Sequence, residues 1–247
     1  MKTGSLCSLC TLCALLALFL LGLKPAFCVN ANSDTPEIAP SFQEHATDKR
    51  EKPLKSGPND YFGSAVVLWR ADWRPHRLPV KIFIDNSSPG DKCYKPEWKQ
   101  MLYDSFLEWE SATDGLLKVK RVDKEDDADI VCHWLAHRSQ LNQFCDARIY
   151  SYGYTSVRGV GLDEKHEPDD ATMYIVTCRD ERAGIAYTDR QMKSICLNQA
   201  GRVLGIQGNS PDPLDAMGKP LRAQQLSDRD RNTIKRLYSL RLDPDRP

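Results

Sequence analysis

Residues 188–217 constrain the fold of this chain more than any other segment, because they join a helix signature to a closely spaced set of turn residues. Thr188 and Gln191 form a capping-box pattern, which predicts that a helix starts there. One face of that helix would carry Met192, Ile195, Cys196, Gln199 and Val203. Gly205 follows and can end the helix in a left-handed turn. The segment therefore predicts a packed helix followed by a redirected loop.

The end of this helix and the loop after it contain a closely spaced series of glycine, proline and acidic residues that ends at a methionine. The residues of this series are Gly201, Leu204, Gly205, Gly208, Ser210, Pro211, Pro213, Asp215 and Met217. In this order and spacing the segment resembles secreted, bacterial-type matrixins of the metzincin family, whose motif runs His-Glu-x-Gly-His-x-Leu-Gly-Leu-x-Gly-His-Ser-Pro-x-Pro-x-Asp-x-Met. The similarity extends from about Leu78 to Tyr238 and includes Leu226-Ser227-x-Arg229-Asp230.

The resemblance implies a metzincin or zincin-like fold of the α/β (α+β) class. Such a fold has a twisted mixed sheet packed with two long helices, a Met-turn, here at Met217, and a C-terminal helix. The family also implies zinc, often structural calcium, and a cleft beneath a sheet edge that holds an extended peptide. The sequence has no EF-hand spacing that would predict a calcium site. The acidic runs at 123–127 and 169–170 are most simply interpreted as solvated loops.

The positions that carry zinc chemistry in this motif hold other residues here. Asn198 and Arg202 stand at the two ligand positions one helical turn apart, and Gln199 stands at the general-base position. The third ligand position is Asn209, or Gly208 at the strict spacing. Amides are poor zinc ligands, a guanidinium has no lone pair to give, and Gln199 cannot accept a proton at neutral pH. We therefore expect no catalytic residue and no bound metal.

The sequence leaves three functions open. The first is a catalytically inactive pseudoprotease that keeps a peptide-binding cleft containing Arg202, Ser210, Asp212 and Asp215. Arg202 would then pair with Asp212 or Asp215, or contact a peptide carbonyl or carboxylate. The alternative is an active zinc-dependent endopeptidase with non-standard ligands. The third is a regulator that binds the substrates or inhibitors of active relatives. The sequence also leaves the oligomeric state open.

The first 31 residues have the features of a secretory signal peptide: Lys2, an apolar stretch at 11–23, and small residues up to Ala31. The apolar stretch is too short for a comfortable membrane span, so we expect a secreted, extracytoplasmic protein without a stable span after cleavage. The remaining chain divides into an expected flexible polar linker at 32–60, a matrixin-like domain at 61–242 and a tail at 243–247.

The charge balance argues against nucleic acid as a partner. The 247-residue chain has 34 basic and 34 acidic side chains, and loss of Lys2 and Lys24 with the signal peptide leaves a formal net charge of −2. No basic block is present in the mature part. A nucleic-acid-binding surface normally needs such a block.

Hydrophobic periodicity predicts the remaining elements. Alternating or continuous apolar runs predict strands at 79–84, 116–122, 128–134 and 172–177. A stripe of Trp98, Met101, Leu102, Phe106 and Trp109 predicts a helix that starts near Pro96, and Ser227 begins a last helix with Ile234, Leu237 and Tyr238 facing inward. This order predicts an α/β sandwich on a mixed sheet, while residues 138–170 show no clear pattern.

Five cysteines remain after the signal region: Cys93, Cys132, Cys145, Cys178 and Cys196. Some of them can pair in an exported protein, but five cannot all pair internally, and their spacing does not favour a zinc site. His133 and His137 stand four residues apart, but we expect them on a strand that runs into a loop. There the two side chains would lie more than ~10 Å apart, so we expect no metal site.

Overall fold

The computed structural model describes residues 56–65, 73, 78–87, 90–144, 152–158 and 170–240, all within a compact unit that spans residues 41–247. The predicted signal peptide, residues 32–55 of the predicted linker, Cys145 and the predicted tail lie outside the described residues. No helix in the described ranges is long and apolar enough to cross a membrane.

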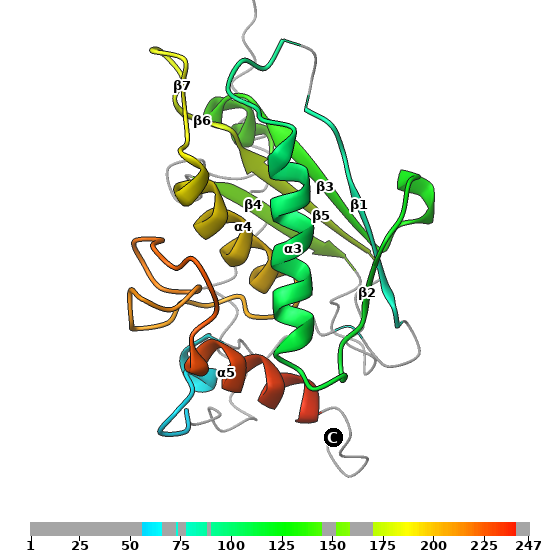
Figure 1. Cartoon of the computed structure of the whole chain (residues 1–247), viewed down its shortest axis with the longest axis vertical. Helices are drawn as coiled ribbons and strands as arrows, with labels where there is room; N and C mark the ends of the chain where they lie inside the picture. Colours follow the sequence, from blue (N-terminus) through cyan, green and yellow to red (C-terminus); the bar gives the residue numbers. More distant parts are fainter. Residues whose placement is uncertain are drawn as a thin grey trace, which may run out of the picture. The chain divides into compact units, whose positions relative to one another are not determined.

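A five-stranded mixed sheet forms one layer of the fold (Figure 1). Its spatial order is β2 (Val119–Arg121), β1 (Val80–Ile84), β3 (Ile130–Leu135), β5 (Asp170–Val176) and β4 (Gly153–Arg158). The first four strands pair in parallel, whereas β4 runs antiparallel to β5 and forms one edge. The predicted α/β fold on a mixed sheet is therefore confirmed.

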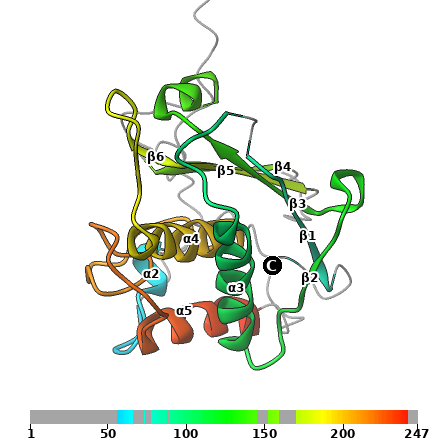
Figure 2. The ribbon, with the colours of Figure 1, turned by 45° about the horizontal axis from the view of Figure 1, so that its top comes forward.

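Two long helices cover one face of this sheet (Figure 2). They are α3 (Glu97–Ser111) and α4 (Asp189–Val203), which pack against each other. The predicted stripe of α3 is buried at Trp98, Leu102, Phe106 and Trp109, while Met101 is half-buried. Trp109 also donates its indole N–H to the carbonyl of Leu197 at 2.9 Å, so the large apolar side chains both fill the core and fix the two helices together.

The predicted starts of α4 and of the last helix are confirmed by complete capping boxes. The Thr188 hydroxyl accepts the N–H of Gln191, and the Ser227 hydroxyl accepts the N–H of Asp230 at the start of α5 (Asp228–Ser239). The inward-facing residues of α5 are Ile234, Leu237 and Tyr238, as predicted. These caps satisfy main-chain donors that the first helical turn leaves without partners.

The strand boundaries differ from the prediction where side chains compete for the backbone. The strand predicted at 116–122 is reduced to β2, because Thr113 accepts the N–H of Leu117 and holds the preceding residues in a turn. Residues 138–170, which showed no clear sequence pattern, contain a 3-10 helix, η3 (Arg138–Gln143), and the edge strand β4.

Two further small elements complete the described structure. A short 3-10 helix, η2 (Glu125–Asp127), precedes β3, and β6 (Cys178–Asp180) pairs with β7 (Ile185–Ala186).

Residues 56–60 fall in the predicted linker, yet they contact α5. The Asp60 carboxylate lies 3.0 Å from the Arg236 guanidinium, and the carbonyl of Asn59 accepts a side-chain N–H of Asn232 at 3.0 Å. The short helix α2 (Phe62–Ala65) follows, and both Tyr61 and Phe62 are buried. This segment therefore packs as part of the fold.

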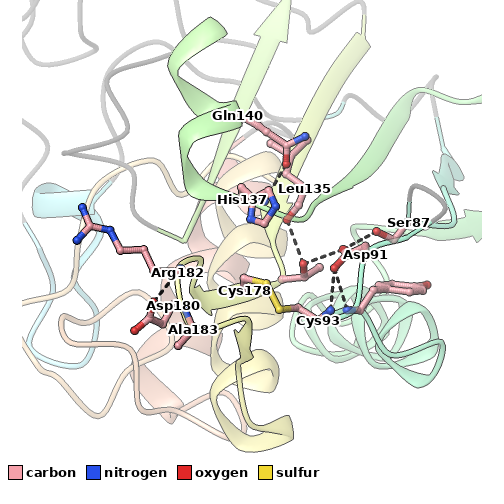
Figure 3. The surroundings of a disulfide bond; sticks show 12 residues. Ser87, Asp91, Cys93, Leu135, His137, Gln140, Cys178, Asp180, Arg182 and Ala183 are labelled. Atoms are coloured by element: carbon pink, nitrogen blue, oxygen red, sulfur yellow. Dashed lines mark hydrogen bonds between the residues drawn. A yellow bond between two sulfur atoms is a disulfide. The ribbon is translucent and has the colours of Figure 1, made fainter.

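A disulfide between Cys93 and Cys178 joins the loop before α3 to β6 (Figure 3). Asp91 organises the same place, because its carboxylate accepts the main-chain N–H of Cys93 at 2.9 Å and the hydroxyl of Thr177 at 2.8 Å. Cys132 and Cys196 are free thiols in the core, and burial raises the pKa of both. The sequence left the cysteine pairing open, and the structure pairs Cys93 with Cys178, which ties β6 to the segment just before α3.

Candidate functional site

Three polar residues of the site lie on the last turns of helix α4. Asn198 and Gln199 are almost fully buried, and Arg202 is half-buried one turn later. Gly201 lies among them at a close approach: an added Cβ would lie 2.7 Å from a ring carbon of Trp109 and 2.8 Å from the sulfur of Met217. Glycine at this position therefore lets both large side chains contact the helix directly.

The end of α4 turns the chain back toward its own last turn. Gly205 has a φ of 113°, in the region that favours glycine. Its N–H bonds to the carbonyl of Arg202 at 3.1 Å, and the N–H of Ile206 bonds to the carbonyl of Gly201 at 3.0 Å. These two bonds define a Schellman motif, which confirms the predicted left-handed ending. As a result, Gln207 and Asn209 return beside Arg202.

The guanidinium of Arg202 joins the helix to this returning loop. Its Nε donates to Oδ1 of Asn198 at 3.0 Å, and its Nη2 donates to Oδ1 of Asn209 at 3.0 Å. A third N–H, on Nη1, donates to the carbonyl of Gln207. The three positions that the resemblance assigns to metal ligands are thus connected by one cation of the protein itself. This arrangement also brings Asn209, rather than Gly208, into the site.

Both amides of the segment 198–199 are occupied by hydrogen bonds inside the protein. Asn198 donates its Nδ2 to the carbonyl of Ala216 at 3.0 Å and lies 3.8 Å from the sulfur of Met217. Gln199 donates its Nε2 to Oδ1 of Asn198 at 3.3 Å and accepts the hydroxyl of Thr155, on β4, at 3.3 Å. The network therefore runs from the edge strand through α4 to the loop that carries Met217.

The loop 210–218 is held by contacts within itself. The N–H of Ser210 bonds to the carbonyl of Met217 at 3.0 Å, and the Ser210 hydroxyl donates to the carboxylate of Asp215. A Cβ on Gly218 would come within 2.1 Å of the carbonyl oxygen of Asp212, so only glycine permits this close approach of the main chain. Met217 is fully buried beneath the loop.

The described ion pairs of Asp212 and Asp215 are made with another arginine than Arg202, with which a pairing was expected. These carboxylates face Arg229 of α5, with N···O distances of 3.6 Å to Asp212 and 3.5 Å to Asp215. Asp215 also accepts the hydroxyl of Ser227 at 2.6 Å. The loop thus turns both acids toward α5, where Arg229 and Ser227 hold them.

Asp230 and Tyr61 support the loop that carries Met217, a role in the site that the sequence did not indicate for either residue. Asp230 accepts the N–H of Ala216 at 2.9 Å, the N–H of Ser227 at 2.8 Å and the hydroxyl of Tyr61. Burial raises the pKa of Asp230, although these hydrogen bonds oppose the shift, and burial beside Asp230 raises the pKa of Tyr61. The signal available in the sequence was the capping position of Asp230, which also points its carboxylate at the Met217 loop.

Zinc does not fit the donor set at the predicted site. The converging side-chain atoms are two amide oxygens and a guanidinium, and a permanent cation there would repel a divalent ion. Within the described ranges, the one group of three potential ligand atoms is Asp91, Cys93 and Cys178, and its two sulfurs are bonded to each other (Figure 3). Neither place has the free thiolates, imidazoles and carboxylates that zinc requires.

His133 and His137 lie on different elements, as expected. His133 is on β3, where its ring stacks on Tyr174 and lies 3.4 Å from a carboxylate oxygen of Asp85. His137 is the N-terminal cap of η3 and accepts the N–H of Gln140. Each imidazole thus has a contact of its own within the protein, and the two contacts lie on different elements.

The edge strand β4 lies beside the site. The N–H of Val176 on β5 bonds to the carbonyl of Tyr152, just before β4, and the register of the two strands then shows which β4 residues bond to β5. In an antiparallel ladder, alternate residues direct their N–H and C=O groups to opposite sides. The main-chain groups of Gly153, Thr155 and Val157 therefore point away from β5, along the edge nearest Gln199.

The comparisons with known proteins are sparse. No protein-family model matches the sequence, and no curated protein matches it. Among solved structures, the chain is similar to the structure of myroilysin, with 12% sequence identity and a TM-score of 0.43. That similarity covers 70% of this chain and 98% of the other. Identity and overlap of this size assign neither a family nor an activity to this chain.

Proposed function

We propose that this chain is a secreted matrixin-like protein that has exchanged metallopeptidase chemistry for peptide binding. In this proposal residues 1–31 are a signal peptide, the loop around Met217 is a Met-turn, and the mature protein acts outside the cytoplasm. The order of the motif from Gly201 to Met217 supports the family relationship, and the mixed sheet with its two helices is compatible with it.

The position of Arg202 is the main support for the proposed loss of peptidase activity. Its guanidinium bridges Asn198 and Asn209, the residues at the first and third ligand positions of the motif. A zinc-bound water needs an open coordination position and a nearby general base. Here a protein cation holds the ligand positions together, and Gln199 at the base position is engaged by Thr155 and Asn198.

Peptide binding is supported by the geometry of β4. An extended peptide placed antiparallel along this edge can bond to the outward main-chain groups of Gly153, Thr155 and Val157. The peptide would then pass beside the segment of α4 that carries Gln199 and Arg202, since Thr155 contacts Gln199. Backbone hydrogen bonding does not require a metal, so this binding mode survives the loss of the ligands.

The direct test compares the native protein with a restored variant. Asn198→His, Gln199→Glu, Arg202→His and Asn209→His together rebuild the full donor set of the motif. Purified native protein should contain no stoichiometric zinc by elemental analysis and should leave a quenched fluorescent peptide mixture uncleaved. The restored variant should take up zinc and gain cleavage that a chelator removes.

A three-substitution variant that keeps Gln199 is the matched control. It should take up zinc without efficient cleavage, because it lacks the base that activates the zinc-bound water. The alternative function, an active endopeptidase with non-standard ligands, would instead give native protein with bound zinc and chelator-sensitive cleavage. That result would overturn the proposal.

A further inference from the structure

Asp91, Cys93 and Cys178 form a cluster of potential metal ligands away from the candidate site (Figure 3). Each residue offers one ligand atom, and these atoms lie within 4.8 Å of one another. In the structure the two sulfurs are bonded as a disulfide, with the Cα atoms 5.3 Å apart. Every chain is synthesised with free thiols, so the same cluster has two thiols and a carboxylate before that bond forms.

Main-chain contacts hold both cysteines independently of the disulfide. The N–H of Cys93 bonds to the carboxylate of Asp91 at 2.9 Å, and the N–H of Cys178 bonds to the carbonyl of Ala136 at 3.3 Å. Cys178 also pairs with Ala186 in the ladder of β6 and β7. Cys93 is 1% exposed and Cys178 is 4% exposed, so their side chains have little room to turn apart. The reduced cysteines therefore face each other from fixed positions.

The carboxylate of Asp91 is oriented by four hydrogen bonds. Its Oδ1 accepts the N–H of Cys93 and, at 3.2 Å, the N–H of Tyr94. Its Oδ2 accepts the hydroxyl of Ser87 at 2.6 Å and the hydroxyl of Thr177 at 2.8 Å. Hydrogen bonds of this kind hold carboxylate ligands in the correct orientation in metal sites. None of the four depends on the sulfur–sulfur bond.

Thr177 lets this carboxylate accept an ion without a change in the main chain. Its hydroxyl carries one hydrogen, and two acceptors lie within its reach: Oδ2 of Asp91 at 2.8 Å and the carbonyl of Leu135 at 3.1 Å. When the hydroxyl donates to Leu135 alone, one lone pair of Oδ2 becomes free. Thr177 directly precedes Cys178, so this lone pair lies on the side of the cluster that carries the thiol.

The size and chemistry of the reduced cluster suit zinc. With zinc–sulfur bonds of about 2.3 Å, the two sulfurs of a tetrahedral site lie about 3.8 Å apart, which is within the spread of this cluster. Two thiolates favour zinc and other thiophilic divalent cations over calcium and magnesium, which prefer oxygen ligands alone. Asp91 is half-buried, so water can reach the cluster and supply a fourth ligand.

We propose that Asp91, Cys93 and Cys178 bind one zinc ion, or another thiophilic divalent cation, in protein whose disulfide has not formed. The two thiols release their protons as the ion binds, because the thiolate is the ligand. A disulfide oxidant then takes two electrons from the thiolates, the sulfur–sulfur bond forms, and the ion leaves. The ion and the disulfide are thus alternative links between β6 and the segment before α3.

The test uses the proposed mature chain, which lacks the four cysteines of residues 1–31. One sample is reduced with a phosphine that is then removed without air, and the other keeps its disulfide. Zinc affinity is measured by competition with a chromophoric chelator. Cadmium is the second probe, because its bonds to thiolates absorb in the near ultraviolet. Reduced protein should bind one equivalent of zinc and show the cadmium–thiolate absorption, whereas oxidised protein should do neither.

Single substitutions assign the ligands in the reduced protein. Cys93→Ser and Cys178→Ser should each weaken zinc binding about hundredfold, and Asp91→Asn should weaken it about tenfold. Cys132→Ser is the matched control, because Cys132 is a free thiol buried in the core. Cys145→Ser is a second control, since Cys145 lies outside the described residues. Both controls should bind zinc like the native protein.

Stability gives an independent readout. Zinc should raise the urea midpoint of reduced native protein but not that of the double variant Cys93→Ser and Cys178→Ser, because only the first has the site. The inference is overturned if reduced native protein takes up no zinc, or if Cys93→Ser binds it as tightly as Cys132→Ser. Equal affinity of Asp91→Asn and native protein would overturn the three-ligand site. Loss of the fold on reduction, seen by far-ultraviolet circular dichroism, would do the same, because the site requires adjacent thiols.

Discussion

Arg202 donates its Nε–H to the side-chain oxygen of Asn198, four residues earlier in α4, at 3.0 Å. Residues four apart share a helix face, and metalloproteases use that spacing for two histidines that bind one ion. In this chain the same spacing joins an amide to a cation that is covalently part of the helix. The same guanidinium holds the returning loop to the helix through Gln207 and Asn209, and these contacts need no metal.

Arg202→Met should destabilise the protein by about 2 kcal/mol, because it removes three hydrogen bonds from a charged donor and leaves their oxygens without that partner. Arg202→Lys should lose most of the same stability, since an ammonium cannot span the planar arrangement of the guanidinium. Urea unfolding measures both. Arg222→Met, at an exposed arginine, is the control, and equal midpoints for all variants would contradict the structural role of Arg202.

Gly201→Ala should cost about 1–3 kcal/mol through overpacking. The new methyl group would lie 2.7 Å from Trp109 and 2.8 Å from Met217, and the rigid indole cannot move away easily. In a Met217→Ala background the cost should be smaller, because one of the two obstacles is gone. Thermal and urea unfolding of the four proteins give the coupling. Additive effects would mean that Met217 does not press on Gly201.

The sequence predicted the elements whose local chemistry and periodicity agree. α3, α4 and α5 were predicted because apolar side chains recur at helical spacing and capping residues mark the starts of α4 and α5. β4 was missed because Gly153, Tyr154 and Thr155 give little alternation of apolar and polar side chains. Its place at the edge comes from pairing with β5, a contact between distant segments that a local pattern does not contain.

The candidate site was predicted in its residues but not in its contacts. The motif spacing located Asn198, Arg202 and Asn209, and the structure brings these three together. The contacts of the two acids were not predicted, because charge alone suggested Arg202 as their partner, whereas the path of the loop turns Asp212 and Asp215 toward Arg229. Such choices depend on where the main chain returns after Gly205, which side-chain chemistry cannot reveal.

Asp60→Asn should remove stability that depends on pH. Burial alone would raise the pKa of Asp60, but the N–H groups of Phe62 and Gly57 and the Arg236 guanidinium outweigh it, so the pKa lies below the ordinary 3.8. A lowered pKa stabilises the fold above the unfolded value and loses this effect as the pH falls through the folded value. The variant should therefore be about 1 kcal/mol less stable near neutral pH, with the difference shrinking below about pH 4.

Urea unfolding at several pH values checks this prediction. Asp126→Asn is the matched control, because Asp126 is an exposed aspartate in η2. Its difference from the native protein should stay near zero throughout. A constant difference for Asp60→Asn down to about pH 2 would show that the carboxylate charge is not the cause.

Loss of the Cys93–Cys178 disulfide should lower stability by about 4 kcal/mol. The bond closes a loop with a sequence separation of 85, and restricting so long a loop in the unfolded chain has an effect of this order. The double variant Cys93→Ser and Cys178→Ser should match the native protein treated with a reductant. Cys132→Ser, in which the free buried thiol is changed, should remain sensitive to the reductant. Equal stability of native protein with and without reductant would contradict the prediction.

Val157→Pro should weaken peptide binding more than it weakens the fold. The N–H of Val157 points away from β5 by the alternation of the ladder, so proline removes a donor from the outer edge and leaves the pairing with β5 in place. Val157→Thr keeps that N–H and serves as the control for the altered side chain. We expect affinity for a peptide selected by the native protein from an array of random extended peptides to fall about tenfold for the proline variant and little for threonine. If both variants bind equally well while remaining folded, the peptide does not add to the sheet at β4, and the binding surface must lie elsewhere.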